Sequence, residues 1–276
     1  MTETTIVEQK DNIATIILNR PKALNSLNIT LVDELANILH RLRDDNSIRC
    51  IVITGNGPAF CAGGDLEYLS KLKDATLSRK FIRDAGGIAS TIVDIEKPVI
   101  AMVNGVAAGA GFNLALACDF IFASRSAKFG QGFVKVGLVP DCGGTFFLSR
   151  HIGLNRAKEL LFTADFIDAE AACRLGLVNR VTEDFELKDV VQKFALKLAN
   201  NAPIALGFTK KLVNRNYCVN LDTCLEFEAD VQSYCMLTEE HQEGIAAFRE
   251  KRQPKFNEIK SLSDSPILNL LHKSYF

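Results

Sequence analysis

The stretch CIVITGNGPAFCAGGDL, residues 50–66, contains the pattern that decides the fold class of this chain. Its first five residues are apolar or β-branched and predict a short buried strand. A turn rich in Gly and Pro closes that strand, and helical spacing begins after it. The alternation recurs, so we expect strands also at 13–18, 98–103 and 120–123, and helices at 31–42, 66–74, 78–95 and 111–117. Buried strands that alternate with helices indicate an α/β core.

The pattern changes after about residue 185, where strand-like runs stop. Helical periodicity then continues through residues 187–199, 203–216, 221–236 and 239–251, and Gly and Pro become rare. This shift predicts a helical appendage behind the α/β core. Residues 257–276 form a tail with several Ser and Asp residues and one short apolar stretch.

Composition excludes several classes of protein. The 276 residues carry 32 Lys and Arg against 33 Asp and Glu, a net charge of −1, which gives nucleic acid no basic surface to bind. The sequence shows no apolar run of the ~18 residues that cross a membrane, and no signal peptide. Eight cysteines without a CxxC pair and four histidines without ligand spacing argue against disulfides and against a metal site. We therefore expect a soluble, cytoplasmic protein.

The segment FCAGGD, residues 60–65, is the first of three that could carry chemistry. Its small residues let a ligand approach the backbone, and the Ala62 amide would then donate to a carbonyl oxygen. The alternative is a tight strand-to-helix turn in which Asp65 caps the next helix. Cys61 is more simply explained as a small buried side chain.

The segment NGVAAGAGFN, residues 104–113, is the second. It joins a predicted strand to a helix, and a helix N-terminus presents free amides that suit a developing oxyanion. Close packing of helix against strand would also require small residues. The segment lacks the pattern of a dinucleotide site.

The segment GLVPDCGGT, residues 137–145, places Asp141 among apolar side chains. A carboxyl group that loses solvation there has a raised pKa and can carry protons near neutrality. The alternative is an ordinary turn in which the Asp141 side chain bonds to the backbone of Gly143.

The three segments in this order resemble the crotonase family of acyl-CoA enzymes, the enoyl-CoA hydratases and isomerases. The resemblance extends through RPKALN (20–25), KPVIAMVNG (97–105), DAEA (168–171), GLV (176–178) and RQPKF (252–256). It implies an α/β fold built as a spiral of ββα turns over residues 1–200, a helical trimerisation region at 201–256 and a tail at 257–276. It further implies a homo-trimer or hexamer and a coenzyme A thioester as substrate, without a metal, nicotinamide or flavin.

The resemblance also assigns roles to individual residues. It implies that the amides of Ala62 and Ala110 bind the thioester oxygen. Contacts to the coenzyme are implied for Lys22, Ala23, Leu24, Ala62, Gly63, Gly64, Asp65, Leu66 and Gly109. Lys255 and Phe256 match a stretch that often reaches the coenzyme of a neighbouring subunit.

Two departures from the family pattern bear on the reaction. Hydratases of the family activate water with two glutamates, and these positions fall on Asn113 and Phe133, which exchange no proton at neutral pH. Asp141 falls where a branch that includes ring-epoxide isomerases of phenylacetate breakdown and Δ3,Δ2-enoyl-CoA isomerases has its single acid–base carboxylate. This implies an isomerase in which Asp141 removes a proton from C2 and returns it at C4.

Other functions remain open at this point. An atypical hydratase, a hydrolase or a dehalogenase would fit the same scaffold, the last with Asp141 as nucleophile and a His to activate water. We expect His151 to serve as a surface or capping residue, and a Cys142 nucleophile would lack a His base. Loss of both glutamates also suits a binding-only paralogue, whereas RNA binding would need a basic patch.

Overall fold

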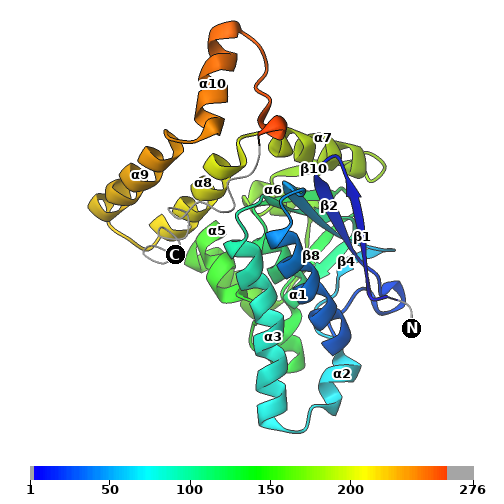
Figure 1. Cartoon of the computed structure of the whole chain (residues 1–276). Helices are drawn as coiled ribbons and strands as arrows, with labels where there is room; N and C mark the ends of the chain where they lie inside the picture. The colour runs from blue at the N-terminus through cyan, green and yellow to red at the C-terminus, as the bar shows by residue number, and fades with distance from the viewer. Residues whose placement is uncertain (1–2, 260–276) are drawn as a thin grey trace.

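Two β-sheets form the centre of the molecule (Figure 1). The structure is a computed structural model that describes residues 3–259. Within these residues the larger sheet has six strands, in the order β1 (Thr5–Lys10), β2 (Ile13–Leu18), β3 (Cys50–Gly55), β5 (Val99–Val103), β7 (Phe120–Ser124) and β10 (Arg180–Thr182). The smaller sheet orders β4 (Ala59–Cys61), β6 (Val106–Ala108), β8 (Lys128–Gly130) and β9 (Ile167–Asp168). All neighbours are parallel except the pairs β1–β2 and β8–β9.

Helices and short 3-10 turns connect the strands. The α-helices of the core are α1 (Ile29–Asp44), α2 (Leu66–Lys71), α3 (Ala75–Asp94), α4 (Ala110–Ala117), α5 (Gly144–Thr163), α6 (Ala169–Arg174) and α7 (Leu187–Ala199). Those that follow are α8 (Pro203–Asn216), α9 (Leu221–Cys235) and α10 (Glu239–Glu250). The 3-10 turns are η1 (Pro21–Ala23), η2 (Gly132–Val136) and η3 (Phe256–Glu258). Asn28 caps α1, because its side chain accepts a hydrogen bond from the Leu31 amide.

The chain repeats one unit as it moves across the sheets. A strand in the larger sheet is followed by a strand in the smaller sheet and then by a helix, as in β5–β6–α4 and β7–β8–α5. This confirms the predicted α/β class and the repeated ββα turns. The strands of the larger sheet at 13–18, 50–55, 99–103 and 120–124 were predicted, whereas β1 and the short strands β4, β6, β8, β9 and β10 were not.

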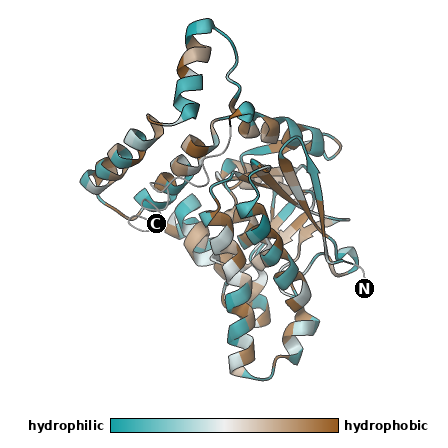
Figure 2. Ribbon diagram, in the orientation of Figure 1, coloured by the Kyte–Doolittle hydropathy of each residue, from teal (hydrophilic) through white to brown (hydrophobic). Residues whose placement is uncertain are grey.

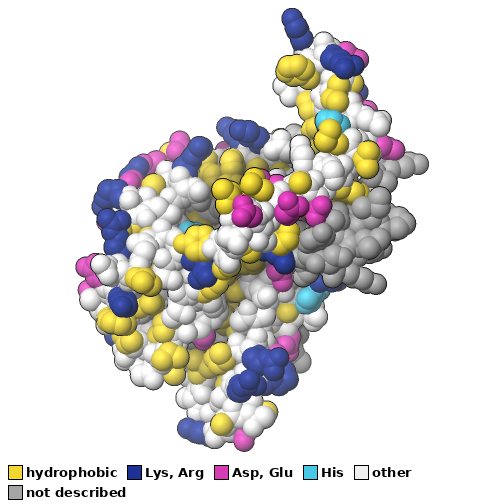
Figure 3. Space-filling model, turned by 90° about the vertical axis from the view of Figure 1, so that its left-hand side faces the viewer, with side chains coloured by type: hydrophobic (Ala, Val, Ile, Leu, Met, Phe, Trp, Pro, Cys, Tyr) yellow, Lys and Arg dark blue, Asp and Glu magenta, His cyan; other side chains and the backbone are white. Residues whose placement is uncertain are grey.

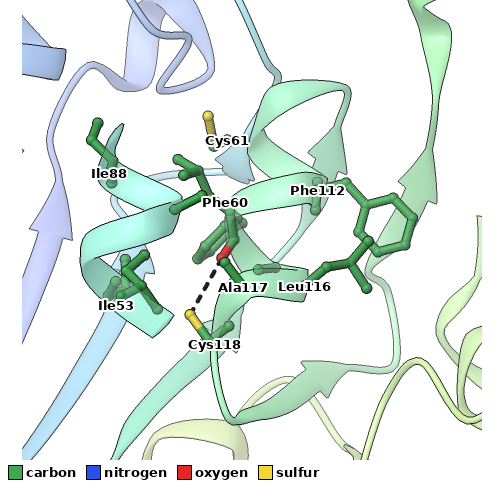
Figure 4. Close-up of a cluster of buried hydrophobic side chains, with 14 of the residues drawn as sticks. Ile53, Phe60, Cys61, Ile88, Phe112, Leu116, Ala117 and Cys118 are labelled. Atoms are coloured by element: carbon green, nitrogen blue, oxygen red, sulfur yellow. Dashed lines mark hydrogen bonds between the residues drawn. The ribbon is translucent and has the colours of Figure 1, made fainter. Parts of the chain in front are cut away.

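Successive side chains along the strands of the larger sheet point to opposite faces, and each face packs into a separate hydrophobic core. Residues on one face of β2, β3, β5 and β7 pack against α7, including Val52, Ile100 and Phe122. Their neighbours on the other face join α1, α3, α4 and the smaller sheet in the main core. In Figure 2 the strands and the inner faces of these helices are hydrophobic, and in Figure 4 Phe60, Ile88 and Phe112 lie in this core.

The helices α8, α9 and α10 form an arm: α8 packs against the core through Lys210, and α9 and α10 project from it (Figure 1). The arm carries hydrophobic side chains on its surface (Figure 3), with exposed members at Leu221, Leu225, Met236, Leu237, Ile245 and Phe248. The predicted boundary at residues 200 and 201 falls between α7 and α8. The trimerisation role of the arm stays a prediction, and residues 260–276 of the predicted tail lie outside the described residues.

The sequence indicates a helical run that begins at about His151, whereas helix α5 begins earlier. The helix begins at Gly144 and is kinked at Gly153, whose φ of 76° is non-helical. That kink interrupts the periodicity, so the first half gave no helical pattern. Among the described residues, no helix combines the length and the hydropathy required to cross a membrane.

Candidate active site

Two strand-to-helix junctions bring their backbones into contact. The FCAGGD segment leads from β4 into α2, and the segment after β6 leads into α4. A Cβ added to Gly63 would lie 2.9 Å from the Ala108 carbonyl oxygen and 3.4 Å from the Ala110 nitrogen. Gly63 also has a φ of 97°, which other residues rarely adopt. The close approach of the two junctions therefore depends on glycine at this position.

The backbone amides at these junctions that lack an acceptor among the described residues include those of Gly64 and Ala110. The Leu27 amide donates to the Gly63 carbonyl at 2.7 Å, and the Asp65 amide donates to the Leu27 carbonyl at 2.9 Å. This parallel bridge leaves the Gly64 amide without a partner among the described residues. Ala110 is the first residue of α4, so its amide has no acceptor within the helix.

The Ala62 amide is not available for a ligand. It donates to the Leu24 carbonyl at 3.0 Å, a bond that ties the loop after η1 to FCAGGD. This corrects the expectation that Ala62 supplies a donor, whereas the expectation for Ala110 agrees with its free amide. Every non-proline residue carries an N–H group, so the sequence alone does not tell which one lacks a partner.

The segment around Lys22, Ala23 and Leu24 lies beside residues 62–66. Besides the bond from Ala62, an ion pair of 2.8 Å joins Arg20 to Asp65. Asp65 also caps α2 by accepting from the Tyr68 amide at 3.1 Å, as the turn interpretation predicted. Lys22, Leu24 and Leu66 are exposed next to these contacts. The fold thus assembles the predicted coenzyme contacts from the N-terminal half of the chain.

Lys255 and Phe256 lie elsewhere in the chain's own fold. The Lys255 amide donates to Glu243 at 2.7 Å, and the Phe256 carbonyl accepts from Arg49 at 2.8 Å. No hydrogen bond in the described part of the chain connects either residue to residues 62–66. Their contact to a neighbouring subunit's coenzyme stays a prediction.

Asp141 carries a carboxyl group that is partly withdrawn from solvent. Its Oδ1 atom is buried and has no hydrogen-bond partner among the described residues. Burial raises the pKa of this carboxyl group, and a hydrogen bond from the Cys142 thiol partly opposes the shift. The side-chain bond to Gly143 that an ordinary turn predicts is not among the hydrogen bonds of residues 3–259; the Gly144 amide donates instead to the Asp141 backbone carbonyl at 2.9 Å.

Asn113 and Phe133 occupy the two positions that the resemblance assigns to hydratase glutamates. Asn113 is fully buried in the first turn of α4, and its Nδ2 donates to the Asp141 carbonyl at 2.8 Å. The Phe133 ring is also buried and would lie 3.5 Å from a Cβ added to Gly109, the residue before α4. Asp141 and the Ala110 amide are thus linked through the same helical turn, beside an aromatic wall.

The remaining nucleophile candidates are unsuited to attack. Burial raises the pKa of the Cys142 thiol, and it raises the pKa of Cys61 to about 12. Cys61 lies among core side chains, as predicted (Figure 4). His151 is exposed on α5 and its side chain bonds to the Leu116 carbonyl, while desolvation lowers its pKa. The described residues contain no cluster of His, Cys, Asp and Glu that could hold a metal ion.

Replacing Gly63 by Ala is expected to disturb both junctions. The added methyl group would press on the Ala108 carbonyl in a backbone conformation that alanine rarely adopts, at a cost of about 1–3 kcal/mol. Displacement of the neighbouring amides should lower kcat by roughly 10- to 100-fold. Thermal unfolding and steady-state kinetics would measure both effects. Gly132→Ala is the matched control, because a Cβ there meets nothing within 4 Å; equal behaviour of the two variants would contradict the prediction.

Comparison with known proteins finds relatives that match almost the whole chain. A family model described as enoyl-CoA hydratase/isomerase matches residues 8–260. The short-chain-enoyl-CoA hydratase of Clostridium acetobutylicum is 38% identical over 90% of this chain and 95% of its own length. The 1,2-epoxyphenylacetyl-CoA isomerase of Escherichia coli is 39% identical over 93% of this chain and 99% of its own length. A crystal structure of enoyl-CoA hydratase from Bacillus anthracis superposes with a TM-score of 0.88 at 35% identity, covering 92% of this chain and 99% of that one. The chain belongs to the enoyl-CoA hydratase/isomerase family.

Proposed function

We propose that this protein is an acyl-CoA isomerase that converts a 3-enoyl-CoA into the conjugated 2-enoyl-CoA, with Asp141 as its single acid–base group. The observation that carries the proposal is the buried, unpartnered carboxyl oxygen of Asp141, anchored through Asn113 to the helical turn that begins with the free Ala110 amide. A ring-epoxide acyl-CoA is the alternative substrate class, supported by the likeness to the E. coli epoxyphenylacetyl-CoA isomerase.

The chemistry requires one proton carrier and stabilisation of one oxyanion. The Asp141 carboxylate takes the C2 proton, and the electron pair of that C–H bond moves toward the thioester carbonyl. The amides of Gly64 and Ala110 then donate to the enolate oxygen, and each such donor is typically worth about 3–4 kcal/mol in the transition state. Protonation at C4 by the carboxylic acid moves the double bond to C2–C3 and restores Asp141 to its initial state.

Hydration of a 2-enoyl-CoA is the second candidate, favoured by the likeness to the Clostridium hydratase and to the Bacillus enzyme. Water addition needs a group that removes a proton from water and a group that protonates C2. The Asn113 amide already donates to a carbonyl, and Phe133 has no exchangeable proton. Asp141 would have to perform both steps, so we rank hydration below isomerisation.

The same family membership supports a proposal about assembly and location. We infer that the arm of α8–α10, with its exposed hydrophobic side chains, joins copies of the chain into a trimer or a hexamer. A cytoplasmic location fits the eight cysteines, which are all free in the described residues.

The decisive experiment supplies three substrates in parallel: a 3-enoyl-CoA, a 2-enoyl-CoA and a ring-epoxide acyl-CoA. Absorbance of the conjugated thioester follows isomerisation, and mass spectrometry detects a product that has gained water. Conversion of the 3-enoyl-CoA or of the ring-epoxide acyl-CoA into a product that has not gained water supports the proposal. Rapid conversion of the 2-enoyl-CoA to a 3-hydroxyacyl-CoA, without isomerisation, would instead establish a hydratase. Tight binding of all three without turnover would indicate a binding-only protein.

A further inference from the structure

We propose that Asn113, itself oriented by Gln131, is the positioning residue that holds Asp141 in its catalytic geometry. This inference rests on the proposed acid–base role of Asp141. It assigns a new task to the position at which hydratases carry a glutamate: Asn113 would act through the backbone of the acid–base residue rather than on the substrate.

A buried chain of hydrogen bonds connects the three residues. Gln131 Nε2 donates to Asn113 Oδ1 at 2.7 Å, and Asn113 Nδ2 donates to the Asp141 carbonyl oxygen at 2.8 Å. Both residues are buried, with exposed fractions of 0% for Asn113 and 1% for Gln131. A backbone carbonyl only accepts, so it forces the Asn113 amide nitrogen toward Asp141 and its oxygen toward Gln131. The Asp141 carbonyl therefore determines which atom donates and which accepts in both hydrogen bonds.

The turn that this chain holds is strained. Cys142 has a φ of 45° and Gly143 a φ of 77°, two consecutive left-handed residues directly after Asp141. A left-handed conformation at a residue with a side chain persists only where its surroundings impose it. Two donors converge on the Asp141 carbonyl, the Gly144 amide and Asn113 Nδ2, and they supply that constraint.

Close packing makes the clamp rigid. A Cβ added to Gly144 would overlap the Asn113 side-chain amide, so α4 and the start of α5 meet without space between them. Asn113 lies three residues after Ala110, within one turn of α4. The helix that presents one oxyanion donor therefore also sets the position of the acid–base carboxyl group, and the distance between the two depends on one side chain.

The cost of this arrangement supports a positioning role. Gln131 Oε1 is buried without a partner among the described residues, which is unfavourable by about 1–3 kcal/mol. An apolar residue at 131 would avoid this penalty. The hydrogen bond that the Gln131 side chain donates to Asn113 offsets this penalty.

Two substitutions at Asn113 test the inference. Asn113→Leu has a similar size but donates nothing, so kcat should fall by roughly 10- to 100-fold while KM changes less than about twofold. Hydrogen exchange at residues 141–147 should also become faster, because the turn loses one of its two clamps. The exchange measurement is independent of which substrate the enzyme uses.

Asn113→Asp gives the sharper result. It keeps the shape and the acceptor for Gln131, yet it donates to the Asp141 carbonyl only when protonated. Activity should therefore rise with pH as Asp141 ionises and then fall again as residue 113 ionises, so the pH–activity profile is bell-shaped, whereas that of the wild type reaches a plateau. If the carboxylate at residue 113 instead acted as a new base, activity would continue to rise as residue 113 ionises. The ionisable groups that face this turn in the described residues are the Asp141 carboxyl and the thiols of Cys142 and Cys61.

Two further variants separate the possible outcomes. Asn179→Leu removes a different side-chain bond, to the Ile121 amide, and should lower thermal stability without changing the pH profile or the exchange at 141–147. Asp141→Asn reports on the proposed function itself. If Asp141→Asn is inactive but Asn113→Leu keeps wild-type kcat and wild-type exchange, the positioning role is overturned while the acid–base role stands. If Asp141→Asn retains full activity, the acid–base role is overturned. If hydrogen exchange at residues 141–147 is then also unchanged in Asn113→Leu, the proposal that Asn113 holds this turn is overturned as well.

Discussion

Asp141→Asn is expected to lower kcat for conversion of a 3-enoyl-CoA to the 2-enoyl-CoA by about 10²–10⁴-fold, because it removes the only proposed proton carrier. The amide has the shape of the carboxyl group but does not exchange a proton at neutral pH. KM should change little, since the coenzyme contacts are predicted at Lys22–Leu24 and at residues 62–66, outside the substituted turn. Steady-state kinetics at saturating and limiting substrate would separate the two parameters.

The pH dependence of the wild-type enzyme should have a definite sign. The base must be ionised to accept the C2 proton, and burial raises the pKa of Asp141 above that of an ordinary carboxyl group. Activity should therefore be lost as pH falls through this raised pKa, at a higher pH than an exposed aspartate would give. Asp33→Asn, at an exposed position of α1, should retain wild-type kinetics and the same profile. Full activity of Asp141→Asn, or a profile without this acidic limb, would contradict the assignment.

Lys210→Met is expected to reduce the free energy of unfolding by about 3–5 kcal/mol, the usual cost of leaving a buried charge without its partner. Lys210 lies in α8, and its Nζ forms an ion pair of 2.8 Å with Asp119. The same atom donates to the carbonyls of Ile92 and Lys97, at 2.8 and 3.1 Å. The exposed fractions of the Lys210 and Asp119 side chains are 6% and 20%, so water can replace the lost partner only in part. Chemical denaturation at one protein concentration would measure the change.

Two variants identify the source of that loss. Lys80→Met removes an exposed ion pair with Asp84 in α3 and should cost no more than about 0.5 kcal/mol. Adding Asp119→Asn to Lys210→Met should recover part of the stability, because no unpaired charge then remains and the Val99 amide keeps an acceptor. Equal losses for Lys80→Met and Lys210→Met would show that burial of the pair is unimportant.

Local sequence was sufficient where a strand is buried on both faces. Strands β3, β5 and β7 lie inside the larger sheet, and their continuous apolar runs predicted them. Strands β4, β6 and β8 have three residues each, too few for any periodicity to appear, and they exist because parallel neighbours pair with them. Helix α5 was half missed for a related reason, since a left-handed glycine divides its pattern.

The sequence by itself determined the α/β class and the family resemblance, and it led to the prediction that Asp141 is the acid–base carboxyl group, because these depend on residue types in order along the chain. Tertiary structure alone decided which amides are free: pairing with Leu24 uses the Ala62 amide, and the bridge to Leu27 leaves that of Gly64 unpaired. It also decided that Asn113 Nδ2 donates to the Asp141 carbonyl, across 28 residues of sequence. The physical reason is that backbone groups are the same at nearly every residue, so only their partners in space distinguish them.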